Sequence, residues 1–588
     1  MIEYHGYHGG QVYLAEYLFT RLYQVGVRSV HGVPGDYNLT SLDFIEPAGL
    51  HWVGNANELN AGYAADGYGR INGISALVTA FGVGELSALN AIGGAFAERV
   101  PVVHVVGTPA THAQNSQSIL HHSLGDGNFR VFARIYKDFT CAQANLTNPK
   151  TAPEEIDRVI LQCLKQSRPV YIELPTDLVK AKVYSHRLNQ SLKVLLIENC
   201  PNIEEDLIKE LCQRIQNTRR PSFIVDGFTR QADMLEEMNK FIYITGYPTY
   251  VTPSGKGRVN ESFPNFRGTY MGSVGKDVHV EWVNSCDLVI RFGPLDADTN
   301  TYGFTTLTNR KITIDINETS INMQGVLYDN LNTKILLQKL FAMVYHLGRS
   351  SLLEPYPKLG NPRRDRIQSL LPPMEDGLIE QKTFWTRISD FLKPNDVILT
   401  ETGTPSSGGQ DLILPPATTM INSAIWLSIG YTLAASVGVA LAQRDLVAEK
   451  KRPEGRTIVF QGDGSFQMTA QSISDVFRNR LNLTIFLINN DGYTIERHIH
   501  GMTAGYNDVH PWNYLDAPHF FGAPEDYPVF TRRVVNWGEL RDVMKEKQLI
   551  EGKGFNMVEV VMGQQDAPES LRGLVRLVCE RDGEWEEY

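Results

Sequence analysis

The sequence has few of the features that mark secreted or disulfide-stabilised proteins. It contains only six cysteines in 588 residues. Their spacing is too wide for a disulfide framework or a Cys-x-x-Cys metal site, and few, scattered thiols are typical of a reducing compartment. The first residues, MIEYHG, lack the basic start and apolar run of a secretory signal, and the final EWEEY is not a retention or peroxisomal address. We therefore expect a cytoplasmic protein.

The sequence also lacks a basic block. Lys and Arg number 55 against 66 Asp and Glu, which gives a formal net charge of −11. An acidic chain without a Lys/Arg run attracts neither nucleic acid nor anionic membrane, so we expect neither as a partner. Hydrophobic residues make up 42% and charged residues 21%, as in average soluble proteins, and this excludes disorder, collagen and coiled coil.

Long hydrophobic runs are rare, and residues 425–442 (IWLSIGYTLAASVGVALA) form the one stretch with the length and lack of charge of a membrane span. The stretch is rich in Ser, Thr, Gly and Ala and stands alone in the chain. A helix that is apolar all round is also found buried in a large core or a subunit interface. We expect the buried helix and no membrane partner.

What the chain does contain is an alternation of apolar strand-like runs with helical patterns, which indicates α/β layers with parallel sheets. Two polar, proline-containing stretches, 188–204 and 350–373, are typical of linkers. They divide the chain into domains of ordinary size, for which we predict residues 1–187, 205–349 and 374–570. Each is expected to hold a mostly parallel sheet flanked by helices.

The strongest local pattern lies between residues 456 and 496. It predicts a strand at 457–460, a tight turn Gly462-Asp463-Gly464-Ser465, a helix at 467–481, a strand at 483–488, and then Asn489-Asn490-Asp491-Gly492. Glycines after a strand let the backbone approach a ligand, and a helix N-terminus favours phosphate. The first cluster on its own is explained equally well as an ordinary turn.

The Asp463 carboxylate would repel a phosphate, and a divalent cation between the two removes that conflict. Mg²⁺ prefers oxygen ligands, with one or two carboxylates plus substrate phosphates. The Asp463 carboxylate, the Asn490 amide oxygen and the Gly492 carbonyl would supply three. Both clusters follow strands, and parallel sheets bind ligands at the edge where their strands end.

The GDGS motif followed by NND resembles the diphosphate–metal signature of thiamine diphosphate-dependent enzymes. The resemblance implies that Asp463, Asn490 and Gly492 bind Mg²⁺ and that Gly464 and Ser465 contact the diphosphate. It also implies a glutamate from another domain at the aminopyrimidine N1′, and the match is Glu58 in GNANELN. Judged locally, Glu58 is more simply a carboxylate at a helix N-terminus without chemistry.

The resemblance extends to the rest of the cofactor site. Ile429 corresponds to the residue that supports the bent cofactor, and the Leu427 carbonyl to the acceptor for its 4′-amino group. The implied cofactor-binding residues are Glu58, Thr404, Leu427, Ser428, Ile429, Gly462, Asp463, Gly464, Ser465, Asn490 and Ile495.

Four further motifs resemble the pyruvate decarboxylase branch: PGDYN from Pro34, LHHSLG from Leu120, ETGT from Glu401 and DGYTIE from Asp491. Taken singly, each has an ordinary structural explanation. Together they imply an acid–base set of a near-neutral histidine pair and carboxylates, which is suited to moving protons. Its members are Asp36, His121, His122 and Glu496, which act beside Glu58.

The implied reaction is the non-oxidative decarboxylation of a 2-oxo acid, pyruvate first, to an aldehyde and CO₂. Thr299 and Pro405-Ser406-Ser407 replace bulkier residues of relatives, so a larger acid such as phenylpyruvate, indolepyruvate or a branched-chain 2-oxo acid stays an alternative. A synthase of the superfamily and a non-catalytic regulatory subunit are further alternatives. The resemblance implies a dimer or tetramer, because the cofactor lies between the first domain of one subunit and the third of another.

Overall fold

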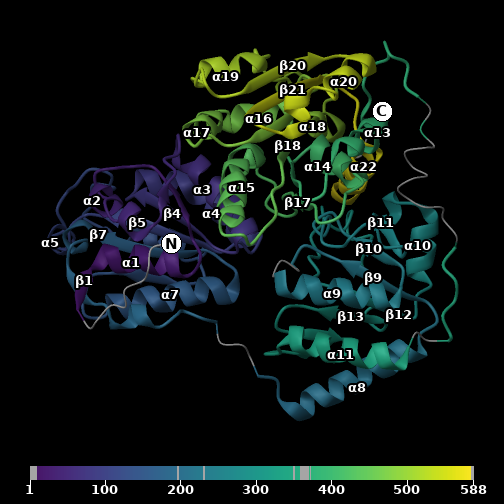
Figure 1. The fold of residues 1–588 in the computed structure, drawn as a ribbon, viewed down its shortest axis with the longest axis horizontal. Helices are drawn as coiled ribbons and strands as arrows, with labels where there is room; N and C mark the ends of the chain where they lie inside the picture. Colours follow the sequence, from purple (N-terminus) through teal and green to yellow (C-terminus); the bar gives the residue numbers. More distant parts are fainter. Residues whose placement is uncertain are drawn as a thin grey trace.

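The computed structural model places three α/β regions along the chain, coloured from purple to yellow in Figure 1. The structure describes residues 10–194, 198–228, 232–348, 351–357, 370 and 372–583. Both chain ends and parts of the two expected linkers lie outside these ranges. The domain limits drawn from the linkers therefore stay predictions.

The first region contains a six-stranded parallel sheet of order β3-β2-β4-β5-β7-β6. Its strands are β2 (Ser29–Gly32), β3 (His51–Trp52), β4 (Ser75–Ala80), β5 (Val102–Thr108), β6 (Gln143–Asn145) and β7 (Val170–Pro175). Its helices are α1 (Leu14–Gln24), α2 (Leu39–Leu42), α3 (Glu58–Asn72), α4 (Val83–Ala97), α5 (Thr111–Asn115), α6 (Val131–Tyr136) and α7 (Ala152–Gln166). Two apolar clusters cover the sheet, with α1 and α7 on one face and α3, α4 and α6 on the other. The short strands β1 (Gln11–Tyr13) and β8 (Lys182–Tyr184) pair separately.

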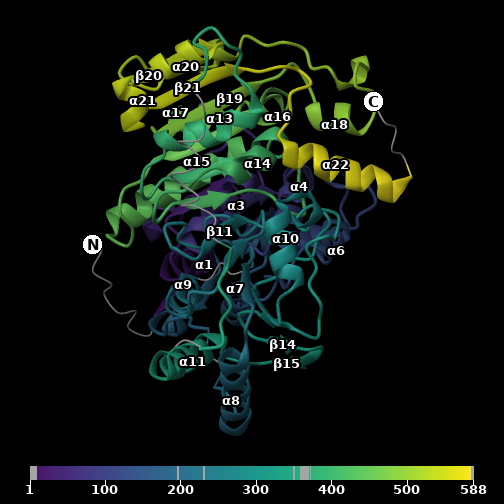
Figure 2. The same cartoon turned by 90° about the vertical axis from the view of Figure 1, so that its right-hand side faces the viewer.

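The third region repeats this design with the parallel order β17-β16-β18-β19-β21-β20. Its strands are β16 (Val397–Thr400), β17 (Thr419–Ile421), β18 (Thr457–Gly462), β19 (Leu483–Asn489), β20 (Val529–Val534) and β21 (Phe555–Val561). Its helices are α13 (Gln381–Ile388), α14 (Thr404–Gly408), α15 (Tyr431–Ala448), α16 (Asp463–Thr469), α17 (Ser472–Arg478), α18 (Thr494–Ile499), α19 (Ala517–Phe520), α20 (Trp537–Val543), α21 (Lys547–Glu551) and α22 (Glu569–Asp582). Figure 2 shows α22 between α18 and the central region.

The central region has the order β11-β10-β9-β12-β13-β14-β15, parallel up to β13 and antiparallel after it. Its strands are β9 (Pro221–Val225), β10 (Thr249–Val251), β11 (Phe266–Thr269), β12 (Leu288–Phe292), β13 (Thr313–Ile316), β14 (Ile321–Met323) and β15 (Val326–Tyr328). Its helices are α8 (Pro201–Asn217), α9 (Ala232–Thr245), α10 (Asp277–Asn284) and α11 (Thr333–Leu347). The predicted class, three mostly parallel sheets flanked by helices, is confirmed.

The apolar run at 425–442 forms a buried helix only from Tyr431, because 425–430 are irregular. This helix, α15, packs against α3 with glycine at the closest points. A Cβ at Gly67 would lie 2.1 Å from the Ala435 carbonyl oxygen, and one at Gly438 would lie 1.7 Å from that of Ala64. Within the described part of the chain, no helix has the length and hydropathy needed to cross a membrane. The expected buried helix is confirmed.

The segment around GDGS needs one correction. The strands predicted at 457–460 and 483–488 are present as β18 and β19, but the predicted turn at 462–465 and the single helix at 467–481 are wrong. The helix starts at Asp463, because an acidic residue is favourable in a first turn. It breaks before Ser472, where two side-chain hydrogen bonds compete with the helical pattern: Thr469 Oγ1 donates to the Gly430 carbonyl (2.6 Å) and Ser474 Oγ to the Gln471 carbonyl (2.7 Å).

Candidate active site

The predicted site residues lie mainly where strands of the first and third sheets end. Asp463 follows β18 and Asn490 follows β19, which are neighbours in the third sheet. Asp36 follows β2, and Gly82 with the start of α4 follows β4; β2 and β4 are neighbours in the first sheet. Parallel sheets bind ligands at this edge. Two sets of side chains result, one in each outer region of the chain.

Three oxygen atoms converge in the third region. One terminal atom of the Asn490 amide lies 2.6 Å from Thr494 Oγ1, and the other lies 3.1 Å from both Asp463 Oδ1 and the Gly492 carbonyl oxygen. With Nδ2 toward Thr494 the second atom is Oδ1, whereas the rotated amide would donate from Nδ2 to both oxygens. Acceptor oxygens do not attract one another. Their spacing is close to the roughly 2.9 Å edge of an octahedron with metal–oxygen bonds of 2.0–2.1 Å. The donor set therefore fits Mg²⁺.

Asp463 is a buried carboxyl that accepts hydrogen bonds from backbone N–H groups. Its side chain is buried, and burial raises the pKa of this carboxyl to about 6. The N–H groups of Gly464 (2.8 Å) and Gly492 (3.1 Å) donate to it and partly offset the cost of burial. No Lys or Arg side chain forms a salt bridge with Asp463 among the described residues. A buried carboxylate without a charged partner is costly, and a divalent cation would supply that partner.

The turn beside this cluster is built for close approach. The Ser465 hydroxyl donates to the Gly462 carbonyl (3.1 Å) and accepts from Gln461 Nε2 (2.9 Å). A Cβ at Gly464 would lie 2.6 Å from the Tyr493 ring, so no larger residue fits there. The first turn of a helix leaves backbone N–H groups free, which suits an anion. Ser465, Gly462 and Gly464 thus lie in a close-packed turn at the start of a helix, and their contact with a diphosphate stays a prediction.

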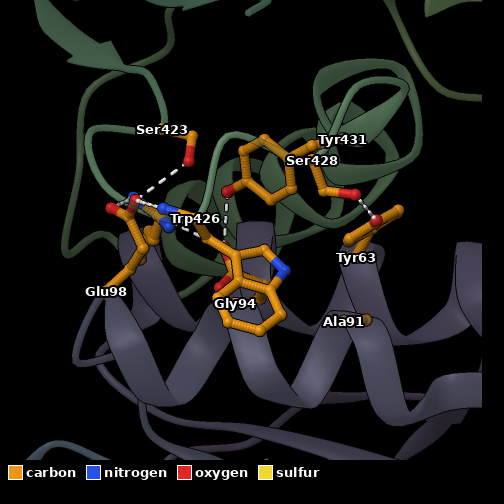
Figure 3. A pocket seen from close by; sticks show the side chains of 10 residues that line it. Tyr63, Ala91, Gly94, Glu98, Ser423, Trp426, Ser428 and Tyr431 are labelled. Carbon is orange, nitrogen blue, oxygen red and sulfur yellow. Dashed lines mark hydrogen bonds and ion pairs between the residues drawn. The ribbon is translucent and has the colours of Figure 1, made fainter. Parts of the chain in front are cut away.

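The segment Leu427–Ile429 lies against the first region, as Figure 3 shows for Ser428. Ser428 Oγ is 2.7 Å from the Tyr63 hydroxyl, and the Leu427 N–H donates to Ser423 Oγ (2.8 Å). Leu427 has φ of 55°, a left-handed backbone that is uncommon for a leucine. The predicted roles of the Leu427 carbonyl and of Ile429 therefore fall on a segment in which Leu427 and Ser428 are both hydrogen-bonded.

Glu58 is the first residue of α3 and is half-buried. The preceding Asn57 caps the helix by accepting from the Asn60 N–H (2.8 Å). A Cβ at Gly84 would lie 3.1 Å from Glu58 Oε1, so glycine leaves room for the carboxylate. Within the described residues Glu58 makes no hydrogen bond or ion pair, and its oxygens are available to another molecule.

Asp36, His121 and His122 do come together. Asp36 Oδ2 lies 2.5 Å from His121 Nε2, and Oδ1 lies 3.8 Å from His122 Nε2. The Tyr37 ring stacks on His121 with centroids 4.9 Å apart. A Cβ at Gly82 would lie 2.1 Å from the His122 carbonyl oxygen. At the start of α4, Gly82 therefore lies close to His122, and Gly84 lies close to Glu58.

The structure does not join the remaining predicted residues to these clusters. Glu496 is exposed in the first turn of α18, and no hydrogen bond or ion pair within the described residues links it to the histidine pair. Ile495 packs against α22, and Thr404 is buried at the start of α14. Thr299 donates from Oγ1 to the Ala424 carbonyl (2.7 Å). Neither the Glu58 nor the Glu496 side chain thus makes a hydrogen bond or an ion pair within the described residues.

Sequence reasoning missed a buried polar cluster between the first and third regions. Figure 3 shows Glu98, Ser423, Trp426 and Tyr431 within it, and Arg70 and Asp66 complete it. A signal existed, because Asp66 and Arg70 stand four residues apart in residues 61–70, which are otherwise small or aromatic. Charges on such a face indicate a buried pair rather than a solvated surface.

Comparison with known proteins identifies the family of the chain. Residues 13–127 match the thiamine pyrophosphate enzyme N-terminal TPP binding domain, residues 208–326 its central domain, and residues 402–560 its C-terminal TPP binding domain. The chain is also 46% identical over 568 residues to a pyruvate decarboxylase from Aspergillus parasiticus, covering 96% of each. The chain belongs to the thiamine pyrophosphate enzyme family, in its pyruvate decarboxylase branch.

Other members of the family support the same placement. Pyruvate decarboxylase isozyme 1 from Saccharomyces cerevisiae is 38% identical over 562 residues, covering 95% of this chain and 97% of that protein. A thiamine diphosphate-dependent 4-hydroxybenzoylformate decarboxylase from Rhodococcus jostii RHA1 superposes with a TM-score of 0.74. That structure covers 95% of this chain at 17% identity and therefore shows the shared fold.

Proposed function

We propose that this protein decarboxylates pyruvate without oxidation, with thiamine diphosphate and Mg²⁺, to an aldehyde and CO₂. The observation that carries the proposal is the Asn490 amide, 3.1 Å from both Asp463 Oδ1 and the Gly492 carbonyl oxygen, in a chain of the pyruvate decarboxylase branch. When bound, thiamine diphosphate supplies a nucleophilic carbon and accepts the electrons released as CO₂ leaves.

The side chains divide the remaining work between them. Asp463, Asn490 and Gly492 would hold Mg²⁺, while Gly462, Gly464 and Ser465 would hold the diphosphate. Glu58 would hold a proton at N1′ of the aminopyrimidine. The Leu427 carbonyl would accept from the 4′-amino group, Ile429 would support the ring from below, and Ser428, Thr404 and Ile495 would border it.

The reaction consumes one proton for each pyruvate, because carbon–hydrogen bond formation replaces the bond to the carboxylate. Asp36 and His121 are hydrogen-bonded, and His122 is 3.8 Å from the same carboxylate. Such a set can relay a proton from solvent, because both Asp36 and His121 are exposed. Glu496 would act beside this set, at the carbon that has lost CO₂.

These roles require a second copy of the chain. Apolar side chains are exposed around the Asp36–His121 cluster and also on the third region, which is the pattern of surfaces that are buried on association. The exposed side chains on the first region are Leu39, Val83, Leu86, Ile119 and Leu124, and those on the third are Met468, Tyr506, Trp512 and Phe520. We propose that residues 1–187 of one subunit, the pyrimidine-binding domain, face residues 374–570 of another, the diphosphate-binding domain, in a cytoplasmic dimer or tetramer. Residues 205–349 form the central domain.

The test is CO₂ release by purified protein supplied with thiamine diphosphate and Mg²⁺, on pyruvate, phenylpyruvate, indolepyruvate and a branched-chain 2-oxo acid. The expected result is the highest kcat/KM on pyruvate and release of an aldehyde. A higher value on a larger acid would assign that substrate instead. Acetolactate as the product would indicate a synthase, and no release from any acid would favour a regulatory subunit. Sedimentation velocity on the same sample measures the subunit number.

A further inference from the structure

Four buried side chains form an ionic cluster at the interface of the first and third regions. They are Asp66 and Arg70 of α3, Glu98 directly after α4, and Tyr431 at the start of α15, and we call them the Arg70 cluster. Arg70 Nε lies 2.6 Å from Asp66 Oδ1, and Nη1 lies 3.5 Å from Glu98 Oε2. The three charged side chains are at most 5% exposed.

Glu98 holds the backbone directly before Leu427–Ile429, the segment that is proposed to contact the cofactor and is called the cofactor segment below. Its Oε1 accepts from Ser423 Oγ (2.9 Å) and from the N–H groups of residues 424–426 (2.8–3.4 Å). Ser423 Oγ in turn accepts from the Leu427 N–H (2.8 Å). One carboxylate oxygen of the first region therefore holds the backbone of residues 423–426 by hydrogen bonds, and Ser423 holds the N–H of Leu427.

Asp66 fixes the backbone after the same segment. The Tyr431 hydroxyl donates to Asp66 Oδ1, and Tyr431 is the first residue of α15, directly after Gly430. Arg70 contacts both ends, because Nη1 donates to the Asn422 carbonyl (3.4 Å) and Cζ lies 5.3 Å above the Tyr431 ring. The cofactor segment is thus flanked by residues that bind Glu98 on one side and Asp66 on the other. Arg70 pairs with both of these carboxylates.

We propose that Arg70 is a positioning residue for cofactor binding, which acts by holding Asp66 and Glu98 in place and thereby the segment Leu427–Ile429. The proposal rests on the assignment of that segment to the cofactor. Two carboxylates buried near each other repel unless a cation lies between them. A planar guanidinium satisfies several acceptors in fixed directions, whereas a lysine ammonium is a point charge and cannot hold them in the same geometry.

The chain offers a matched control. Arg28 also joins the first region to α15, through Glu449 (Nε to Oε1, 2.5 Å), but it does so at the opposite end of that helix, and its hydrogen bonds and ion pair within the described residues do not involve 422–431. Arg70→Lys and Arg28→Lys are therefore the same substitution at two ion-paired arginines beside one interface, although Arg28 pairs across it and the carboxylate partners of Arg70 both lie in the first region. Only the first pair is expected to influence the cofactor segment.

The experiment is isothermal titration of each apo protein, once with thiamine diphosphate and once with inorganic pyrophosphate, both with Mg²⁺. In Arg70→Lys, thiamine diphosphate is expected to bind about 10-fold more weakly, because the support for its rings is loosened, while pyrophosphate binds within 2-fold of wild type. Arg28→Lys is expected to bind both ligands as wild type does. Tyr431→Phe, which removes only the hydroxyl held by Asp66, should show the Arg70→Lys pattern at about 3-fold.

Four outcomes overturn the proposal. Thiamine diphosphate bound equally well by Arg70→Lys and wild type would show that the cluster does not support the cofactor. A parallel loss of pyrophosphate affinity would show a general structural role, as would the same loss in Arg28→Lys. If Arg70→Lys does not fold, wild-type affinity in Tyr431→Phe overturns the proposal alone. Wild-type protein that binds pyrophosphate but not thiamine diphosphate would overturn the proposed function as well.

Discussion

The amide oxygen of Asn490 lies 3.1 Å from the carboxylate oxygen of Asp463. Two acceptors at this distance are stable only with a cation between them or with the amide rotated, so that Nδ2 donates to Asp463. The orientation of Asn490 is therefore tied to the metal. The first prediction follows from this dependence.

Asp463→Asn should abolish the metal site while preserving the shape of the turn. We expect Mg²⁺-dependent thiamine diphosphate binding to weaken at least 100-fold, because the only carboxylate of the proposed ligand set is lost. Titration of the apo protein with Mg²⁺ and thiamine diphosphate measures this. Asp491→Asn, the neighbouring exposed carboxylate, is the control and should bind as wild type does. Equal binding by both variants would contradict the assignment.

Glu58→Gln should lower kcat about 10²–10⁴-fold, the usual contribution of a general acid–base group. Gln keeps the size of the side chain at the start of α3 but cannot hold the N1′ proton in the same way. Steady-state CO₂ release measures kcat. Glu46→Gln is the control, because Glu46 is exposed in the first turn of the short helix Glu46–Ala48 of the same region. A loss of less than 5-fold in Glu58→Gln would remove Glu58 from the catalytic set.

Glu496→Gln should lower kcat by a similar factor and change KM little, because Glu496 is proposed to act on the reacting carbon after substrate has bound. Glu569→Gln, an exposed glutamate in the first turn of α22, is the matched control. If KM rises while kcat stays constant, Glu496 binds substrate rather than moving a proton.

Glu85 should make stability fall as pH rises. This fully buried carboxyl accepts from the Gly82 N–H (2.8 Å) and the Tyr171 hydroxyl (2.7 Å), and burial raises its pKa to about 7 despite both donors. A carboxyl whose pKa is higher in the folded protein stabilises it most below the unfolded value near 4.5. That contribution, of order 3 kcal/mol, is lost as pH rises from about 4.5 to 7.

Glu85→Gln removes this titration. The melting temperature of wild type minus that of the variant should therefore become smaller as pH rises from 5 to 8. Calorimetry of the apo proteins across this interval measures the difference. The same comparison for Glu46→Gln should give a flat line. A constant difference for Glu85→Gln would mean that Glu85 keeps one protonation state throughout.

The parts of the site that lie along one stretch of chain could be predicted from the sequence. Strands β18 and β19 are continuous apolar runs, as buried parallel strands usually are, and the residues after them carry the proposed metal ligands. The contact of Glu98 with residues 423–426 could not be predicted in this way. It joins segments 325 residues apart, and nothing local at either end specifies the other.

The break between α16 and α17 was missed for a related reason. Apolar periodicity continues from residue 467 to 481, but Thr469 Oγ1 donates to the Gly430 carbonyl (2.6 Å), a contact made with another part of the fold. Tertiary hydrogen bonds of this kind override helical preference. The contact of Arg70 with Glu98, which lies directly after α4, is likewise a tertiary contact that the local sequence does not specify.

The backbone contact of α3 with α15 has a thermal consequence. Tyr68 and Asp445, whose side chains are hydrogen-bonded across this contact (2.9 Å), are 377 residues apart. The two helices pack backbone against backbone where glycines cross, so a separation of the helices would expose the whole contact to solvent at once. The outer thirds of the polypeptide should consequently melt as one calorimetric unit. The middle third, which has an apolar core of its own, is then the part that can lose its structure in a separate transition.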